Sequence, residues 1–229
     1  MSVSAAMVFA AGFGTRMGAL TADRPKPLIP VGQRPLLDHA LHLIAPGWRT
    51  VVNAHYRAEQ IANHLDGSRF RISVERPDIL DTGGGLKAAL PLLEATDGRP
   101  VLTLNSDAVW HGPNPLETLN DAWGSDGVDA LLLLVPETRA VGRRLPGDFD
   151  LDAAGLLRRG GPFVYTGAQI IRTRLVQART ERVFSLNAVW DDLIALGRVR
   201  GVLWPGTWCD VGTPAGLELA EDLIRTPLP

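Results

Sequence analysis

The chain has 229 residues, 45% hydrophobic and 21% charged, with a formal net charge of −2. These values predict one globular domain, residues 1–229, with a sizeable core. They argue against general nucleic-acid binding, which needs a basic field, and the longest apolar runs, ALLLLV and AAMVFAA, are too short to span a membrane. Cys209 is the single cysteine and no secretion signal is recognisable, so a cytoplasmic protein is expected.

Short apolar runs alternate with helical patterns in the first 135 residues. Strands are predicted at Ala5–Ala10, Thr50–Asn53, Arg71–Glu75, Val101–Asn105 and Ala130–Val135. Helical spacing is present at Leu37, Leu41 and Ile44, at Ile61 and Leu65, and at Leu86, Leu90 and Leu93. This alternation predicts a single-domain, Rossmann-like α/β fold: a mixed, mostly parallel sheet with helices on both faces.

The stretch from Pro136 to Gly161 breaks this rhythm, and FDLDAAGLLRR within it predicts a hairpin that turns at Ala153–Gly155. After it we expect a strand at Phe163–Ile171, a helix near Asn187–Leu196, a strand at Val199–Leu203 and a helix from Pro214. Ligands of open α/β sheets bind outside the carboxyl ends of the strands. The residues that follow each strand are therefore the first candidates for a site.

The first predicted strand runs into FAAGFGTRM. The dinucleotide pattern G-x-G-x-x-G fails because Met17 holds its third glycine position, and the Walker pattern fails because Ala19 follows Gly18. A glycine-rich turn remains, whose amides can point at an anion, and Arg16 adds a cation suited to bidentate phosphate contact. A tight strand-to-helix turn explains the same residues equally well.

A proline-rich segment, RPKPLIPVGQRPLLDH, follows this turn. It places Lys26 between two prolines, which fix φ and predict an extended, non-helical backbone. A lysine on so rigid a backbone is expected to point at a binding partner. The simpler alternative is a solvated lysine in a loop.

Together, AAGFGTRM and RPKPLIPVGQRPLLDH resemble the signature LAAGxGTRM…PKPL of the enzymes that join a nucleoside triphosphate to a sugar 1-phosphate. The resemblance covers essentially the whole chain. It implies a sugar-1-phosphate nucleotidyltransferase with a glycosyltransferase-A-like fold, whose partners are the two substrates, as a monomer or small homo-oligomer. It further implies that Arg16 and Lys26 are catalytic and that the nucleotide is bound by Ala11, Gly12, Gly14, Thr15, Arg16 and Lys26.

Two later segments continue the resemblance. TLNSDA matches L-x-N-G-D, with Ser106 in place of glycine, and WCDVGTPAGL matches W-x-D-x-G-T-P. The resemblance implies that Asp107 and Asp210 are catalytic and bind Mg²⁺, with Mn²⁺ possible, and that Asp107 also contacts the nucleotide. Mg²⁺ usually takes one or two carboxylates with phosphate oxygens and waters. Taken alone, each aspartate also suits a cap or turn, and Thr213–Pro214 suits the start of a helix.

The remaining candidates flank these motifs. LDTGGG resembles the base-binding segment of the family, which implies nucleotide contacts by Asp81, Thr82, Gly83 and Gly84; a helix start capped by Asp81 or Thr82 is the alternative. Asn53, in VVNAHYRAEQI, is a further nucleotide candidate or a helix entry. The sugar candidates are Asn105, Asp148 in GDFDLD, Gly167 in FVYTGAQII, and Asp210. The E-K-P sugar motif of many relatives is not evident.

Within the family, the length and the LDTGGG and GDF segments most resemble the uridylyltransferases of N-acetylmuramate 1-phosphate, which act in peptidoglycan recycling. This implies UTP and N-acetylmuramate 1-phosphate as substrates. Guanylyltransferases of mannose or heptose 1-phosphate share most of the motifs and stay open. A catalytically silent nucleotide-binding regulatory module would be expected to lose Lys26 or one aspartate, and Met17 argues against an NAD-dependent oxidoreductase.

Overall fold

A computed structural model describes residues 3–124, 127–143 and 146–227. Its strands are β1 (Ala5–Phe9), β2 (Pro30–Val31), β3 (Arg34–Pro35), β4 (Arg49–Ala54), β5 (Arg71–Val74), β6 (Pro100–Asn105), β7 (Ala108–His111), β8 (Ala130–Pro136), β9 (Ala140–Val141), β10 (Phe149–Leu151), β11 (Leu157–Arg159), β12 (Phe163–Arg172), β13 (Val199–Leu203) and β14 (Thr207–Asp210). The α-helices are α1 (Leu36–His42), α2 (Ala58–His64), α3 (Asp81–Leu93), α4 (Pro115–Ala122), α5 (Arg174–Ala178), α6 (Leu186–Ala195) and α7 (Pro214–Arg225). Short 3₁₀ helices are η1 (Thr15–Thr21), η2 (Lys26–Leu28) and η3 (Glu137–Arg139).

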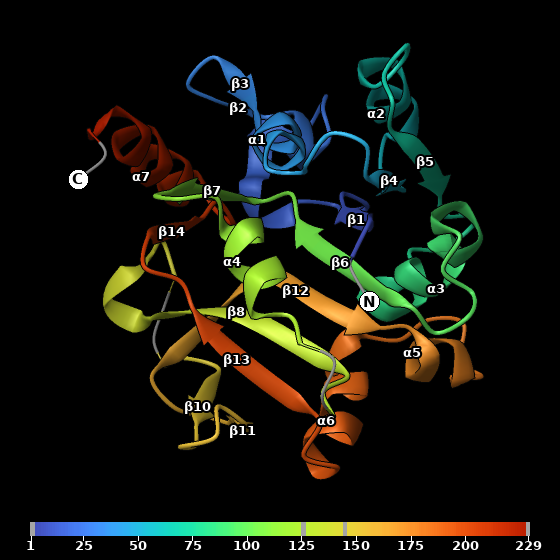
Figure 1. Ribbon diagram of the computed structural model, residues 1–229. Coiled ribbons are helices and arrows are strands. Elements are labelled where there is room, and N and C mark those ends of the chain that lie inside the picture. Colours follow the sequence, from blue (N-terminus) through green and yellow to red (C-terminus); the bar gives the residue numbers. More distant parts are fainter. Residues whose placement is uncertain (1–2, 125–126, 144–145, 228–229) are drawn as a thin grey trace.

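The main sheet has the strand order β11-β10-β12-β6-β1-β4-β5, with β8 paired to β12 and β13 paired to β8. Strands β6, β1, β4 and β5 are parallel, whereas β12 runs antiparallel to β6. The predicted mixed, mainly parallel α/β fold is confirmed, and every predicted strand is present within a residue or two. Figure 1 shows the sheet crossing the centre of the molecule.

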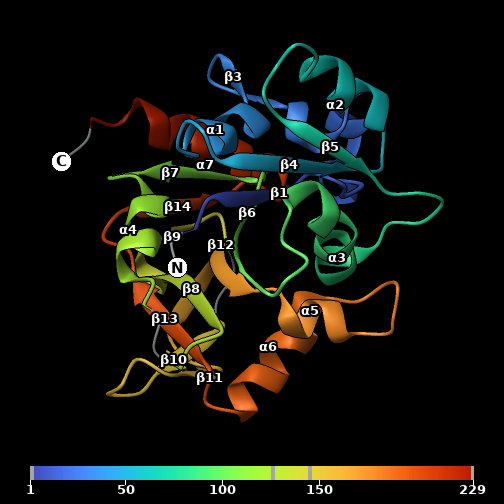
Figure 2. The same cartoon turned by 45° about the vertical axis from the view of Figure 1, so that its right-hand side comes forward.

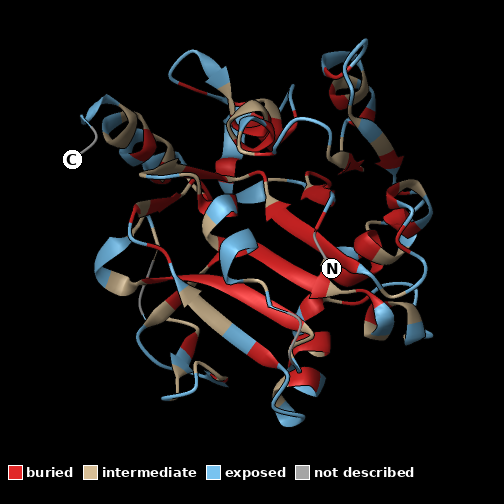
Figure 3. Ribbon diagram, in the orientation of Figure 1, coloured by how far each residue is buried: buried red, intermediate tan, exposed pale blue. Residues whose placement is uncertain are grey.

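Helices cover both faces of this sheet, as Figure 2 shows from a second direction. Alternate residues of β1 explain why its sequence is apolar throughout: Ala6 and Val8 pack in the core under α1, α2 and α4, while Ala5 and Met7 pack in the core under α3, α5 and α6. The central strands are accordingly the buried part of the molecule (Figure 3). No described helix has the length and apolar character needed to cross a membrane.

The predicted hairpin is present as β10 and β11, which pair antiparallel. Asp152 Oδ1 accepts hydrogen bonds from the backbone N–H groups of Ala154 and Leu156, both at 2.9 Å, and thereby closes the turn. The sequence patterns did not reveal α4, nor the small sheet β7-β14-β9. That small sheet positions one of the candidate carboxylates, because β14 ends at Asp210.

Candidate active site

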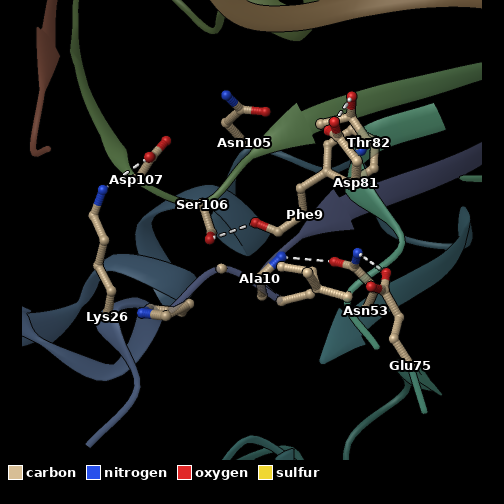
Figure 4. A pocket seen from close by; sticks show the side chains of 14 residues that line it. Phe9, Ala10, Lys26, Asn53, Glu75, Asp81, Thr82, Asn105, Ser106 and Asp107 are labelled. Carbon is tan, nitrogen blue, oxygen red and sulfur yellow. Dashed lines mark hydrogen bonds and ion pairs between the residues drawn. The ribbon is translucent and has the colours of Figure 1, made fainter. Parts of the chain in front are cut away.

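A cavity of about 250 Å³ lies at the carboxyl ends of β1 and β6. Figure 4 shows the Lys26–Asp107 pair on one side of it and the Asn53–Glu75 pair on the other. Many of the predicted nucleotide-site residues meet here. The lining comprises Phe9, Ala10, Ala11, Gly12, Lys26, Pro27, Asn53, Glu75, Ile79, Asp81, Thr82, Asn105, Ser106 and Asp107.

The glycine-rich turn is anchored by the residue that breaks the dinucleotide pattern. Met17 is 1% exposed and packs against the core beneath α7. Gly14 has φ +66°, and a Cβ there would lie 2.8 Å from the Cβ of Lys26, so this close approach needs glycine. Thr15 and Arg16 are exposed and, among the described residues, lie outside the lining of the cavity.

Arg16 nevertheless points toward the second candidate carboxylate. A Cβ at Gly212 would lie 3.0 Å from Arg16 Nη2 and 3.0 Å from Asp210 Oδ2. Both side chains therefore flank Gly212, in the segment that follows β14.

Lys26 is buried, with 7% exposure, and its Nζ donates to Asp107 Oδ2 at 2.8 Å. Lys26 therefore does point at a partner, and that partner is Asp107, a candidate metal ligand. The expectation of an extended backbone is wrong, since Lys26–Leu28 form one 3₁₀ turn. Pro27 lies in the first turn of that helix, where a missing N–H costs no hydrogen bond and the fixed φ suits the helix.

Asp107 and Asp210 are held together by backbone pairing. The N–H of Val211 donates to the carbonyl of Asp107 at 2.9 Å, and Asp210 pairs with Ala108 in the β7–β14 ladder. Burial raises the pKa of the Asp210 carboxyl, and the negative charge of Asp107 raises it further. Two carboxylates that repel each other form a donor set suited to a divalent cation.

Among the residues that the structure describes, no group of three or more Asp, Glu, His or Cys side chains is placed to hold a metal ion. Two carboxylates match what Mg²⁺ usually takes from a protein when phosphate oxygens and waters complete its coordination. The residues present therefore fit the expected ion.

Asn53 belongs to a buried network that the sequence patterns did not reveal. Its Oδ1 accepts from the N–H of Ala10 at 2.7 Å, and its Nδ2 donates to Glu75 Oε1 at 2.6 Å. Glu75, 2% exposed, also accepts from the N–H of Leu80 at 2.7 Å through Oε2. Asn53 thus ties the end of β1 to the segment before α3. A carboxylate at the end of the predicted Arg71–Glu75 strand was the only signal for Glu75.

The LDTGGG segment forms the start of α3. Its N-cap is Leu80, without a side-chain cap, so neither Asp81 nor Thr82 has the capping role. Asp81 has φ +59° and accepts from the N–H of Thr82 at 2.6 Å. Both side chains line the cavity.

Gly83 and Gly84 pack away from the cavity, whose described lining does not include them. Their N–H groups donate to the carbonyl of Phe184 at 2.9 and 3.0 Å, and a Cβ at Gly83 would lie 2.4 Å from the Phe184 ring. Close packing against residues 182–184 explains the glycines. Contact of either glycine with a nucleotide stays a prediction.

Three comparisons with known proteins bear on this site. The sequence profile of the MobA-like NTP transferase domain matches residues 6–186. The chain belongs to this family. Its sequence is 40% identical over 232 residues to the N-acetylmuramate alpha-1-phosphate uridylyltransferase of Caulobacter vibrioides, covering 94% of this chain and 95% of the relative. The enzyme of the same name from Neisseria meningitidis is 31% identical, with 95% and 97% covered.

The fold agrees with that of a solved structure. The inositol-1-phosphate CTP transferase from T. maritima superposes with a TM-score of 0.77 at 16% identity, covering 97% of each chain. The predicted membership of the sugar-1-phosphate nucleotidyltransferases is therefore confirmed, and this NTP transferase has the fold of such enzymes.

A second cavity of this NTP transferase, of about 320 Å³, adjoins the first. The two share Phe9, Asp81, Thr82 and Asn105. The remainder of its lining is Arg143, Asp148, Phe149, Arg159, Tyr165, Gln169, Ser185, Leu186, Asn187 and Trp190. The space therefore continues from the first cavity past Asn105 into the second.

Of the four predicted sugar residues, Asn105 and Asp148 line this second cavity. Gly167, at φ +82°, lies beneath Asn105: a Cβ there would be 2.8 Å from the Asn105 side chain. Asp210 is, among the described residues, outside the lining of both cavities. The sequence patterns did not indicate Arg143, Arg159, Tyr165 or Trp190, all of which line the cavity.

Proposed function

We propose that this protein transfers a uridylyl group from UTP to N-acetylmuramate 1-phosphate, giving UDP-N-acetylmuramate and pyrophosphate. An oxygen of the acceptor's phosphate bonds to the α-phosphorus of UTP, while the bond from that phosphorus to the oxygen bridging to the β-phosphate breaks. The observation that supports this most is the 40% identity, over nearly the whole chain, to an enzyme with that name. The reaction belongs to the cytoplasm, where UTP is made, and fits reuse of a cell-wall sugar.

The geometry supports this type of reaction. A phosphate monoester is largely doubly ionised at neutral pH, so its oxygen needs no strong general base. The barrier is lowered mainly by positioning and by neutralising charge. Lys26, Ala11 and Gly12 line the first cavity, and the Arg16 guanidinium lies beside Gly212 near Asp210. In this proposal they hold the triphosphate and stabilise the pyrophosphate that leaves.

Asp107 and Asp210 would hold a Mg²⁺ ion, with Mn²⁺ as an alternative. When bound, such an ion neutralises phosphate charge and orients phosphate oxygens. The positive charge of the Lys26 Nζ, 2.8 Å from Asp107 Oδ2, offsets the negative charge of that carboxylate when no metal ion is bound. Lys26 therefore holds the Asp107 carboxylate in place before the substrates bind.

A panel of four nucleoside triphosphates against several sugar 1-phosphates tests the proposal, with release of pyrophosphate as the readout. UTP with N-acetylmuramate 1-phosphate should give the highest kcat/KM. A clear preference for GTP with mannose or heptose 1-phosphate would overturn the substrates while leaving the type of reaction. No release of pyrophosphate with any pair would contradict the enzymatic function itself.

A further inference from the structure

The second cavity contains two arginines, Arg143 and Arg159, carried by different elements. The described lining of the second cavity has two carboxylates. Asp81 lies at the boundary with the first cavity, and Asp148 lies near Arg143. Two aromatic rings contribute to the wall of the cavity: the ring centroids of Tyr165 and Trp190 are 4.8 Å apart. A cavity with two cations and an aromatic wall suits a sugar that carries anions.

Arg143 lies at the end of the cavity that is close to the candidate catalytic carboxylates. It follows β9, which runs parallel to β14 with Val141 opposite Cys209. Gly142 is therefore beside Asp210, and a Cβ at Gly142 would lie 2.6 Å from the Asp210 carbonyl oxygen. Arg143 forms an ion pair with Asp148. The other oxygen of Asp148 accepts from the N–H of Tyr165 at 2.9 Å and fixes that pair.

Arg159 belongs to β11, at the edge of the main sheet, and its guanidinium is held in one plane. Its Nε donates to Asp191 Oδ1 at 2.8 Å, its Nη1 to Asn187 Oδ1 at 3.0 Å and its Nη2 to the Asn187 carbonyl at 3.2 Å, so α6 holds it from one side. The guanidinium lies over the ring of Phe149, 4.9 Å from the centroid. A guanidinium has five N–H donors, so one N–H on Nη1 and one on Nη2 remain for a ligand, and both are already oriented.

We infer that this cavity binds an acceptor with two separate anionic groups, in which Arg143 contacts the attacking phosphate and Arg159 contacts a carboxylate at the far end of the sugar. The inference rests on the proposed function, because N-acetylmuramate 1-phosphate carries a lactyl carboxylate besides its phosphate. A planar carboxylate matches the fork of an arginine. Arg159 therefore sets the preference among acceptors, whereas Arg143 serves every acceptor.

Pairs of acceptors in which only one member carries a carboxylate besides its phosphate test this directly. N-acetylmuramate 1-phosphate is compared with N-acetylglucosamine 1-phosphate, which lacks the lactyl group, and the ratio of their kcat/KM values is measured. Arg159→Gln should lower that ratio about tenfold to a hundredfold, the loss expected for a hydrogen bond to a charged group. Arg143→Gln should lower both values and change the ratio less than about threefold.

Arg158→Gln is the matched control. Arg158 is the neighbour of Arg159 on β11, so it points to the opposite face, and it is exposed. Removing its charge should leave both values and their ratio unchanged. Arg159→Lys keeps the charge without the fork and should give an intermediate ratio; it replaces Arg159→Gln if that variant does not fold, as judged by its melting temperature.

An Arg159→Gln ratio equal to that of the wild type would overturn the inference, as would an equal loss from Arg158→Gln. A second pair, glucuronate 1-phosphate and glucose 1-phosphate, separates it from the proposed function. If the wild type rejects N-acetylmuramate 1-phosphate but prefers the uronate through Arg159, the proposed acceptor is wrong and the two-anion cavity stands. A wild type that prefers the acceptor without a carboxylate in both pairs refutes the inference.

Discussion

Replacing Asn53 by alanine separates two roles for this residue. If the amide contacts a nucleotide, Asn53→Ala raises KM for the triphosphate and leaves stability nearly unchanged. If it holds the buried network between β1 and α3, the variant loses stability first. The contacts favour the second outcome, because the Ala10 N–H and Glu75 already engage both ends of the amide.

The size of the effect follows from these two hydrogen bonds. Asn53 is 3% exposed, so neither partner regains full hydration when the amide is removed. A bond between neutral groups contributes about 0.5–1.5 kcal/mol and one to a charged group about 1.5–3 kcal/mol, so we expect a loss of about 2–4.5 kcal/mol. For a chain of this size, that corresponds to a decrease of about 4–18 °C in Tm.

Asn105→Ala is the matched comparison. Asn105 lines the first cavity, as Asn53 does, and also the second cavity. Its removal should lower kcat/KM with a smaller change in Tm. Thermal melts followed by circular dichroism, with pyrophosphate-release kinetics at a temperature well below both transitions, measure the two quantities. A wild-type Tm for Asn53→Ala together with a raised KM for UTP would refute the network argument.

Three further predictions concern the centre of the site and the thiol beneath it. Asp107→Asn and Asp210→Asn should each nearly abolish turnover in a folded protein, and EDTA should do the same to the wild type; full activity in any of these conditions removes the metal assignment. Lys26→Met should lower kcat/KM about a hundredfold or more, and Arg16→Lys should also be impaired because an ammonium lacks the fork; steady-state kinetics near wild-type values would contradict both. Burial raises the pKa of the Cys209 thiol to about 12, so iodoacetamide should label it at pH 8 only after unfolding. Because this folded pKa lies above that of the unfolded chain, stability is retained below pH 9 and falls above it, by about 1 kcal/mol between pH 9 and 10; chemical denaturation of Cys209→Ala should lack that fall.

The sequence was most informative where a local pattern has a local cause. Apolar runs such as Ala5–Ala10 became buried strands because both of their faces pack under helices. Thr213 and Pro214 start α7 as expected, since the Thr213 hydroxyl accepts from the N–H of Gly216 at 3.2 Å. The motif residues Lys26 and Asp107 also met, although 81 positions separate them.

It was least informative where a role depends on a distant partner. Nothing near Glu75 in the chain indicates that its carboxylate accepts from both Asn53 and Leu80. Gly83 looks like a ligand-approach glycine until Phe184, a hundred positions away, is found against it. Arg143 and Arg159 fall in the stretch whose rhythm is irregular, where periodicity predicts no neighbours. These residues were missed because tertiary contacts, and not local propensity, determine what their side chains and backbone contact.

The position of the second cavity follows from a single reversal of strand direction in the sheet. β6 has a parallel neighbour, β1, on one side and an antiparallel neighbour, β12, on the other. The carboxyl end of β6 therefore meets the carboxyl end of β1 and the first half of β12, which brings Gly167 against Asn105. A ligand held at the end of β1 and a second ligand held along β12 are forced together at Asn105. A wholly parallel sheet would place the amino end of β12 at the opposite edge, so the reversal is what brings the first half of β12 to the edge where β1 and β6 end.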